Sequence, residues 1–133
     1  MSRARGWSRE SASSLTPLYN VSSNANATCW VSITKDGRYA FMSNQLSNNV
    51  SRFAIARSGQ LTLLPGNVPT SGHAADTALS TDSRYLYVLD VLDANGSGGA
   101  LIDTYRVEPD GTLVHLATTD PGIPDGASGL ASS

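Results

Sequence analysis

His73 and Asp76 are the two residues whose types and spacing could support catalysis. A histidine can take a proton from water near neutral pH, and a carboxylate beside it can orient the imidazole ring. A spacing of three residues at a loop-to-strand junction allows the two side chains to touch but does not require it. Each residue also has a structural reading, in which Asp76 accepts backbone hydrogen bonds and His73 is an exposed loop residue. Both readings stay open, with His73 and Asp76 as candidate catalytic residues.

An internal repeat supplies the elements that would position this pair. Residues 29–42 (CWVSITKDGRYAFM) return as residues 75–88 (ADTALSTDSRYLYV), so that Asp36 matches Asp82 and Tyr39 matches Tyr85 at an offset of 46 residues. Each copy reads as an apolar strand, a tight polar turn, and a second strand rich in aromatic and branched residues. Self-similarity with a period of roughly 40–50 residues predicts β-propeller blades or another stacked array.

The repeat predicts two four-stranded units. Strands are expected at 30–34, 39–43, 50–56 and 61–64 in the first unit, and at 76–80, 84–89, 101–107 and 112–117 in the second. Turn signals such as Asp36-Gly37 separate the strands, and a glycine-rich insertion lies in the loop at 90–100. No window carries the apolar stripe of a helix.

We therefore predict an all-β fold, a partial β-propeller with two four-stranded antiparallel blades. The predicted blades span 29–64 and 75–117, an edge strand at 15–21 and the start of a further blade at 126–133 flank them, and residues 1–14 form a disordered tail. An immunoglobulin-like sandwich is the alternative fold, because many short strands in about 100 residues also suit it. The register of the repeat argues against the sandwich.

The composition limits the classes of partner. Charged residues make up 15% of the 133 residues and the net charge is −2, which predicts neither a nucleic-acid nor a membrane partner. Cys29 is the single cysteine, and the sequence lacks metal-ligand spacing and phosphate-binding loops, so we expect no metal and no cofactor. The basic N-terminal residues lack the apolar core of a secretory signal, which favours the cytoplasm.

Blade geometry sorts the polar residues onto two faces. The turns between first and second strands and between third and fourth strands lie on one face, the turn face. The second-to-third loops and the linkers that enter each first strand lie on the other, the loop face. Residues on the turn face recur in register, which indicates turn chemistry and local salt bridges: Asp36, Arg38, Asp82, Arg84 and Asp110. The loop face holds His73 and Asp76, together with the candidate substrate-binding residues Asn26, Asn44 and Asp90; either asparagine could donate to a carbonyl or hydroxyl oxygen.

Three other residues are expected to have no catalytic role. Trp30 is predicted to lie in the core, because its ring is large and apolar. Cys29 has no nearby base and is predicted to be a small buried residue. His115 lies on an outer strand and is predicted to be solvated.

The ordered succession of motifs resembles one group of propellers. Residues 29–39, 43–44, 50–53 and 59–62 resemble one blade of the lactonase family of seven-bladed propellers, which contains bacterial 6-phosphogluconolactonase and the fungal carboxymuconate lactonising enzyme. Residues 76–80, 84–88, 110–113 and 129–131 continue the resemblance. It covers about residues 15–133 and corresponds to the C-terminal third of a full member.

This resemblance implies a hydrolase that adds water to a sugar or muconate lactone without a metal, with His73 as the base and loop-face donors for the oxyanion. Active members carry arginine, histidine and glutamate about the central channel, whereas Asn44-Gln45 stands here where an Asn-Arg pair occurs. We expect the chain to be inactive alone, either as a truncated reading frame or as a unit whose open blade faces need a homo-oligomer or a complementary fragment. The alternative is a non-enzymatic propeller module that binds carbohydrate or protein.

Overall fold

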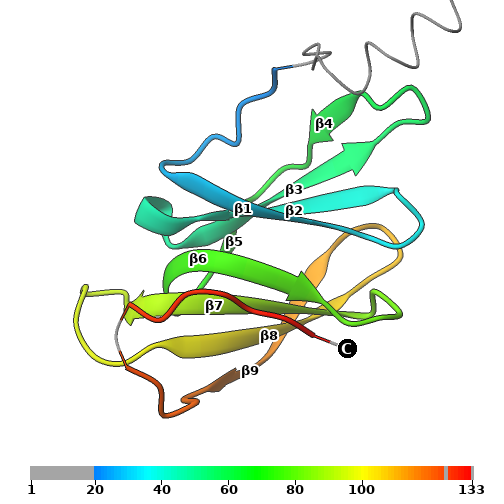
Figure 1. The fold of residues 1–133 in the computed structure, drawn as a ribbon. Coiled ribbons are helices and arrows are strands. Elements are labelled where there is room, and N and C mark those ends of the chain that lie inside the picture. Colours follow the sequence, from blue (N-terminus) through cyan, green and yellow to red (C-terminus); the bar gives the residue numbers. More distant parts are fainter. Residues whose placement is uncertain (1–19, 125, 133) are drawn as a thin grey trace, which may run out of the picture.

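The computed structural model describes residues 20–124 and 126–132, and they form two antiparallel β-sheets (Figure 1). The first sheet has the order β1-β2-β3-β4, with the short strand β5 paired to β3, and the second has the order β6-β7-β8-β9. The bounds are β1 Thr28–Ile33, β2 Tyr39–Asn44, β3 Asn49–Ile55, β4 Leu61–Leu63, β5 Val68–Pro69, β6 Gly72–Leu79, β7 Tyr85–Asp93, β8 Leu101–Val107 and β9 Leu113–Thr119. One 3-10 turn, η1 (Gln45–Ser47), joins β2 to β3. The prediction of an all-β partial propeller with two four-stranded blades is confirmed.

The observed strands differ from the predicted ones mainly at the start of the second blade. β6 begins at Gly72 rather than residue 76, and β7 continues to Asp93 rather than residue 89. The pairing of β6 with β7 shifts register between Gly72 and Ala74 and again between Ala74 and Asp76. Such bulges break the alternation of inward and outward residues, which is why the sequence pattern hid the first four residues of this strand.

Two predicted flanking strands have different outcomes. The edge strand at 15–21 falls largely outside the described residues, and its last two residues, Asn20 and Val21, are not in a strand. Residues 126–132 also form no strand, but they lie across the second sheet (Figure 1). Leu130 packs there against Leu89, Val91 and Ala100, and the N–H of Leu130 donates to Asp76 Oδ2 at 2.8 Å.

The repeated turns are built by the same hydrogen bonds in both blades. Asp36 Oδ1 accepts the Thr34 hydroxyl at 2.7 Å and the Arg38 N–H at 3.0 Å, and Asp82 accepts Ser80 and Arg84 at the same two distances. The first of these bonds, from Thr34, contributes most to holding the pKa of Asp36 below its usual range. The repeated acidic residues therefore serve the turns, as predicted from their register.

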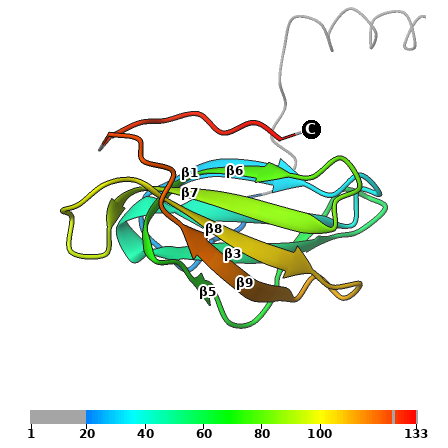
Figure 2. The same ribbon diagram turned by 90° about the horizontal axis from the view of Figure 1, so that it is seen from below.

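The two sheets stack face to face as neighbouring blades (Figure 2). The first strands of the blades lie beside each other, since the Ser32 hydroxyl on β1 lies 2.7 Å from the Thr77 hydroxyl on β6. Between the sheets lies the main core: Phe41, Val50, Ala74, Leu86, Val88, Tyr105 and Leu113. Leu86 and Val88 face this core, while Leu89 and Val91 face the opposite side of the second sheet. This arrangement explains why β7 is apolar on both faces, and each such buried side chain contributes roughly 1.5–3 kcal/mol.

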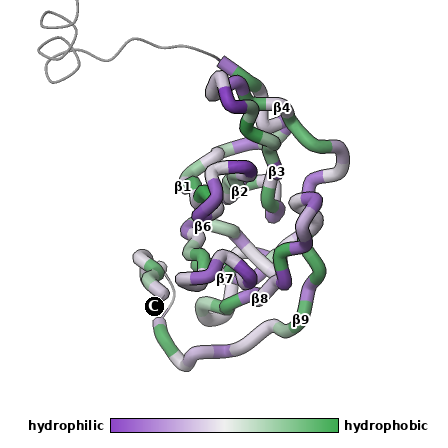
Figure 3. Tube along the Cα trace, turned by 90° about the vertical axis from the view of Figure 1, so that its right-hand side faces the viewer, coloured by the Kyte–Doolittle hydropathy of each residue, from purple (hydrophilic) through white to green (hydrophobic). Residues whose placement is uncertain are grey.

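Two predictions about β1 are wrong. Trp30 is 55% exposed rather than in the core, and Cys29 is exposed rather than buried. β1 is an edge strand that pairs only with β2 in the described part of the chain, so its side chains lack a second flanking strand. Figure 3 marks hydrophobic residues along this strand, and Val31 and Ile33 are 47% and 56% exposed.

The packing of the two blades predicts a specific effect at Gly111. A Cβ atom added there would lie 2.6 Å from Tyr39 Cδ1, and the residue has a φ of +81°. We expect Gly111→Ala to lower the free energy of unfolding by about 2–3 kcal/mol in urea titrations, from backbone strain and the clash together. Gly59 is the equivalent residue in the first blade, with a φ of +86° and no atom within 4 Å of the added Cβ. Gly59→Ala is therefore the matched control, expected to cost only about 1 kcal/mol; equal losses would contradict the contact between the blades.

Candidate functional site

The loop face of the two blades is built from three segments (Figure 1, left side). They are η1, the linker at 70–72 that enters β6, and the loop between β7 and β8. The first two are tied together, because the Thr70 N–H donates to the Asn48 carbonyl at 3.0 Å. The residues before β1 join them, with the Gln45 N–H donating to the Ala27 carbonyl at 2.9 Å. The segments expected on the loop face therefore do lie at one end of the sheets, opposite the repeated turns.

His73 lies partly buried near the start of β6, beside the β7–β8 loop. A Cβ atom added at Gly96 would lie 3.8 Å from His73 Cε1, so the ring sits against this loop. Asp93 is a carboxylate whose pKa is affected by the charge of His73. Hydrogen bonds from the Ser97 and Asn95 N–H groups hold the pKa of Asp93 below its usual range, and the charge of His73 adds to this effect. The sequence spacing alone does not identify Asp93 as a neighbour of His73.

Asp76 uses both of its carboxylate oxygens on backbone groups. Oδ1 accepts the Thr77 N–H at 2.7 Å and Oδ2 accepts the Leu130 N–H at 2.8 Å, and the residue is only 7% exposed. Among the described residues no hydrogen bond joins His73 to Asp76. The arrangement thus matches the structural reading of Asp76, and the catalytic role of the pair stays a prediction.

The hydrogen bond from the Leu130 N–H to Asp76 predicts that this carboxylate holds the segment at 126–132 in place. We expect Asp76→Ala to speed amide exchange of Leu130 at least tenfold, because a hydrogen bond to a charged group contributes roughly 1.5–3 kcal/mol. Hydrogen exchange followed by NMR measures this directly. Ala78→Gly on the same strand is the control, and unchanged protection of Leu130 in Asp76→Ala would show that the carboxylate does not hold the segment.

The two asparagines proposed to bind substrate differ in accessibility. Asn44 is fully buried, accepts from the Thr28 hydroxyl at 2.7 Å, and donates from Nδ2 to Asn49 Oδ1 and Ser51 Oγ, each at 2.8 Å. Its hydrogen-bonding groups are thus already used within the first blade. Asn26 is exposed, and its backbone N–H donates to Ser47 Oγ at 2.8 Å. Of these two, only Asn26 presents its side chain to solvent.

Asp90, the third predicted substrate-binding residue, is fully buried on β7. Neither carboxylate oxygen has a hydrogen-bond partner in the described part of the chain. Burial first, and the neighbouring Asp103 carboxylate second, raise the pKa of Asp90 to about 8. A substrate could reach this carboxyl only if the surrounding strands or linker moved, and its role in binding stays a prediction.

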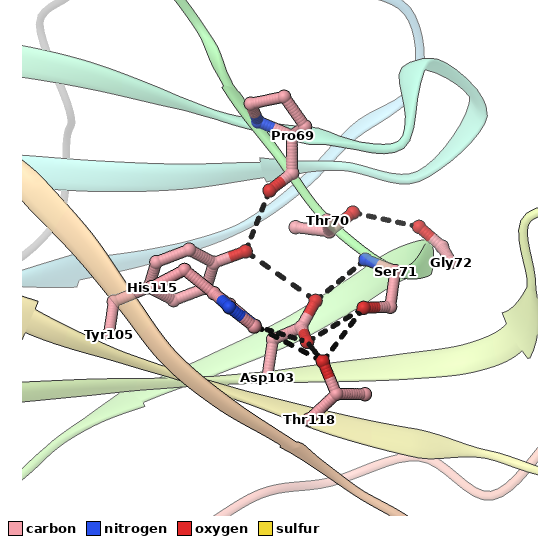
Figure 4. Close-up of polar contacts among 8 residues, drawn as sticks. All are labelled: Pro69, Thr70, Ser71, Gly72, Asp103, Tyr105, His115 and Thr118. Carbon is pink, nitrogen blue, oxygen red and sulfur yellow. Dashed lines mark hydrogen bonds and ion pairs between the residues drawn. The ribbon is translucent and has the colours of Figure 1, made fainter.

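A polar cluster centred on Asp103 was not foreseen from the sequence (Figure 4). Asp103 lies on β8 and its side chain is fully buried. Oδ2 accepts the Ser71 N–H at 2.6 Å, and Oδ1 accepts the hydroxyls of Ser71 at 2.9 Å and Thr118 at 2.5 Å. The Tyr105 hydroxyl donates to the Pro69 carbonyl at 2.7 Å. Burial alone would raise the pKa of Asp103, but the hydrogen bonds from Thr118 and Ser71 outweigh it and lower the pKa.

His115 is exposed, as predicted, but it also belongs to this cluster. Its side chain is half exposed, but Nε2 lies 3.1 Å from Asp103 Oδ1 and the ring meets Tyr105 edge-on with centroids 5.2 Å apart. β9 pairs with β8 so that His115 lies opposite Tyr105. One feature could have predicted this cluster. Asp103 occupies an inward position of β8, two residues before the buried Tyr105, and a carboxylate at such a position needs hydrogen-bond partners.

The cluster has the residue types of a hydrolase triad but not its geometry. In a triad the histidine stands between the serine and the aspartate. Here Ser71 and His115 each contact Asp103 directly, and no hydrogen bond joins Ser71 to His115 among the described residues. A cavity of about 380 Å³ adjoins the cluster. The cluster therefore suits a structural role, in which it holds the linker against the second blade, better than it suits nucleophilic catalysis.

Among residues 20–124 and 126–132, no group of three or more His, Cys, Asp or Glu side chains could hold a metal ion. Within the same ranges, no helix has the length and apolar character needed to cross a membrane.

Comparison with known proteins gives matches only at the level of structure. No protein-family model and no curated protein sequence matches the chain. A protein of unknown function from Desulfotomaculum acetoxidans has a TM-score of 0.66 at 21% identity, over 78% of this chain and 30% of that one. A putative 6-phosphogluconolactonase from Bacteroides uniformis has a TM-score of 0.58 at 17% identity, over 68% and 25% of the two chains. The periplasmic gluconolactonase of Pseudomonas aeruginosa has a TM-score of 0.57 at 22% identity, over 76% and 28%.

Less than a third of each of these solved structures is matched by this chain. At such identities the likeness concerns the fold, which agrees with the two stacked blades. The chain therefore has the fold of part of a β-propeller, which it shares with parts of these proteins.

Proposed function

We propose that the chain is the C-terminal part of a seven-bladed, lactonase-like propeller whose parent activity is the hydrolysis of a sugar or muconate lactone, and that it is inactive alone. The observation that carries this proposal is the fold that its two blades share with a putative 6-phosphogluconolactonase and a periplasmic gluconolactonase. The order of the sequence motifs supports the C-terminal position. A fold alone does not define an activity, so the proposed activity also depends on the residues of the loop face.

The shares of chain matched support the number of blades. The matched region is 30% of the Desulfotomaculum protein, 28% of the Pseudomonas gluconolactonase and 25% of the Bacteroides protein. Two blades of seven would be about 29%, so these proportions suit a wheel of about seven repeats.

The proposed chemistry is general-base hydrolysis at the loop face. His73 would take a proton from water as the water oxygen adds to the lactone carbonyl, and donors would hold the resulting oxyanion. Collapse of that intermediate breaks the ring C–O bond, and the proton returns to the leaving ring oxygen. Asn26 is the exposed donor of the predicted set, while Asn44 and Asp90 would contact a ligand only after rearrangement. Asp93 is better placed than Asp76 to stabilise a protonated His73.

We propose that the chain is inactive alone because its two blades form only part of the site. A propeller forms its central channel from all of its blades, and two blades provide only a part of the lining. Val31 and Ile33 lie on the face of β1 opposite Ser32, away from the second blade, and exposed apolar side chains of this kind are what a further blade covers. We propose that this blade comes from a second copy of the chain or from a complementary fragment.

Binding and turnover separate the two functional hypotheses. With the ¹⁵N-labelled chain and gluconate, the hydrolysis product, we expect weak binding that shifts the amides of His73 and the β7–β8 loop, and no hydrolysis of gluconolactone above the spontaneous rate. His73→Ala should abolish these shifts, whereas Arg84→Ala on the turn face should leave them unchanged. Shifts confined to the turn face, or none at all, would contradict the proposal.

Two other outcomes are informative. Hydrolysis that is unchanged in His73→Ala and Asp76→Ala would remove the proposed site. Binding of intact oligosaccharides without any binding of gluconate would favour the non-enzymatic carbohydrate-binding module.

A further inference from the structure

Asp90 and Asp103 bring two buried carboxyl groups to one face of the second sheet. Asp90 on β7 lies opposite Leu101 on β8, so Asp103 is two residues further along the paired strand. Residues at such diagonal positions project to the same face of a sheet, and the charge of Asp103 acts on Asp90 there. Both side chains are fully buried, and this face is the one that meets the first blade and the linker at 69–72.

The two carboxyl groups differ sharply in their partners. Asp103 accepts hydrogen bonds from the Ser71 N–H and from the hydroxyls of Ser71 and Thr118, and it contacts His115 and Tyr105 as well. Neither oxygen of Asp90 has a partner among the described residues. An isolated buried carboxylate is strongly unfavourable, so Asp90 is expected either to lose its charge or to bind a ligand.

We propose that Asp90 is protonated and neutral beside a charged Asp103, and that this pair is a pH-sensitive latch holding the interblade linker at 69–72 against the second blade. A proton explains the site better than a metal cation. Asp103 already accepts several N–H and O–H groups, and these hydrogens would repel a cation placed beside it.

The groups facing Asp90 define how the latch responds to pH. Asp103 and Tyr105 face it from β8, Thr70 and the Gly72 backbone from the linker, and His115 on β9 touches Asp103. Burial and the Asp103 charge raise the pKa of Asp90 to about 8, far above the value of about 3.9 in an unfolded chain. Because the folded pKa of Asp90 is raised, the contribution of Asp90 to the stability of the folded state is most favourable below pH 4, and it is lost as pH rises to about 8.

Ionisation of Asp90 would place two like charges side by side in the interior. The linker is the segment that this repulsion would release, because Ser71 is held by Asp103 and Pro69 by Tyr105. The backbones of the linker and β7 are also closely packed where they meet. A Cβ atom added at Gly72 would lie 2.0 Å from the Leu92 carbonyl oxygen.

The direct test is a ¹³C NMR titration of the carboxyl groups in the wild-type chain. We expect Asp90 to remain protonated at pH 6 and to ionise with a midpoint between pH 7 and 9, together with faster amide exchange of Ser71, after correction for the intrinsic rate. This measurement needs no variant to fold. A carboxyl of Asp90 that is ionised at pH 6 in metal-free buffer would overturn the proposal.

A variant pair supplies the second test. The urea midpoint of wild type should fall between pH 5 and 9, whereas that of Asp90→Asn should fall much less and be the higher of the two at pH 9. His115→Gln should keep the wild-type slope, which separates Asp90 from the histidine. Equal slopes in wild type and Asp90→Asn would contradict the latch, and so would a gain in midpoint with Ca²⁺ or K⁺ that Asp90→Asn abolishes, because the site would then hold a cation.

Discussion

Replacing Asp103 with alanine is expected to lower the free energy of unfolding by about 3 kcal/mol or more. The substitution removes the hydrogen bonds that Asp103 accepts from the Ser71 N–H and the Thr118 hydroxyl, and a hydrogen bond to a charged group contributes roughly 1.5–3 kcal/mol. Because Ser71 belongs to the linker between the blades, the loss should also appear as faster amide exchange at residues 70–72. Urea unfolding at pH 7 measures the first effect and hydrogen exchange the second.

Glu108→Ala is the matched control for Asp103→Ala. Glu108 pairs with Arg106 at 2.6 Å near the end of the same strand, but the two side chains are 32% and 50% exposed. A solvent-exposed ion pair contributes about 0–1 kcal/mol, so this variant should be close to wild type. Similar losses in both variants would mean that Asp103 is not the centre of a buried network.

Phe41→Ala is expected to cost about 3–5 kcal/mol, the range for truncating a buried aromatic residue. Phe41 is fully buried in the core between the blades, together with Val50, Leu86 and Tyr105. The cavity would open at the contact between the sheets, so the stacking of the blades should weaken before the pairing within each sheet. Chemical denaturation gives the size of the loss, and near-ultraviolet circular dichroism reports the altered packing of the aromatic side chains.

Ile33→Ala provides the comparison for Phe41→Ala. Ile33 lies on β1, which pairs with β2, and it is 56% exposed. An exposed residue loses little burial on truncation, so the cost should stay below about 1 kcal/mol. If Ile33→Ala were the more damaging variant, the core would lie on the other face of the first sheet.

The internal repeat allowed the architecture to be predicted, since each copy carries its own turn residues. Asp36 and Asp82 make equivalent hydrogen bonds, and the strand at 101–107 was predicted with the bounds that β8 has. The repeat could not locate the start of β6, because bulges at Ala74 interrupt its alternation. The prediction that Trp30 lies in the core was wrong, because an apolar residue on an edge strand can stay exposed when no second strand flanks it.

The candidate site was harder to predict, because its contacts join residues far apart in the sequence. Asp76 is bound by Leu130, 54 residues away, and Asp103 by Ser71, 32 residues away. Proximity in sequence suggested Asp76 as the partner of His73, whereas the fold brings the β7–β8 loop with Asp93 to the histidine. Burial of Asp90 and Asp103 likewise depends on the stacking of the two blades, which no local pattern specifies.

The stacked-blade arrangement requires the first strands of two neighbouring blades to lie side by side, with the turn faces in register. Nuclear Overhauser effects test this most directly, between the side chains of Ser32 and Thr77 and between the Tyr39 ring and the Gly111 Hα protons. Both contacts are predicted, because the hydroxyls of the first pair are 2.7 Å apart and the Tyr39 ring lies against Gly111. Their absence from a folded chain, or contacts of β1 with β9 in their place, would contradict the stacked-blade arrangement.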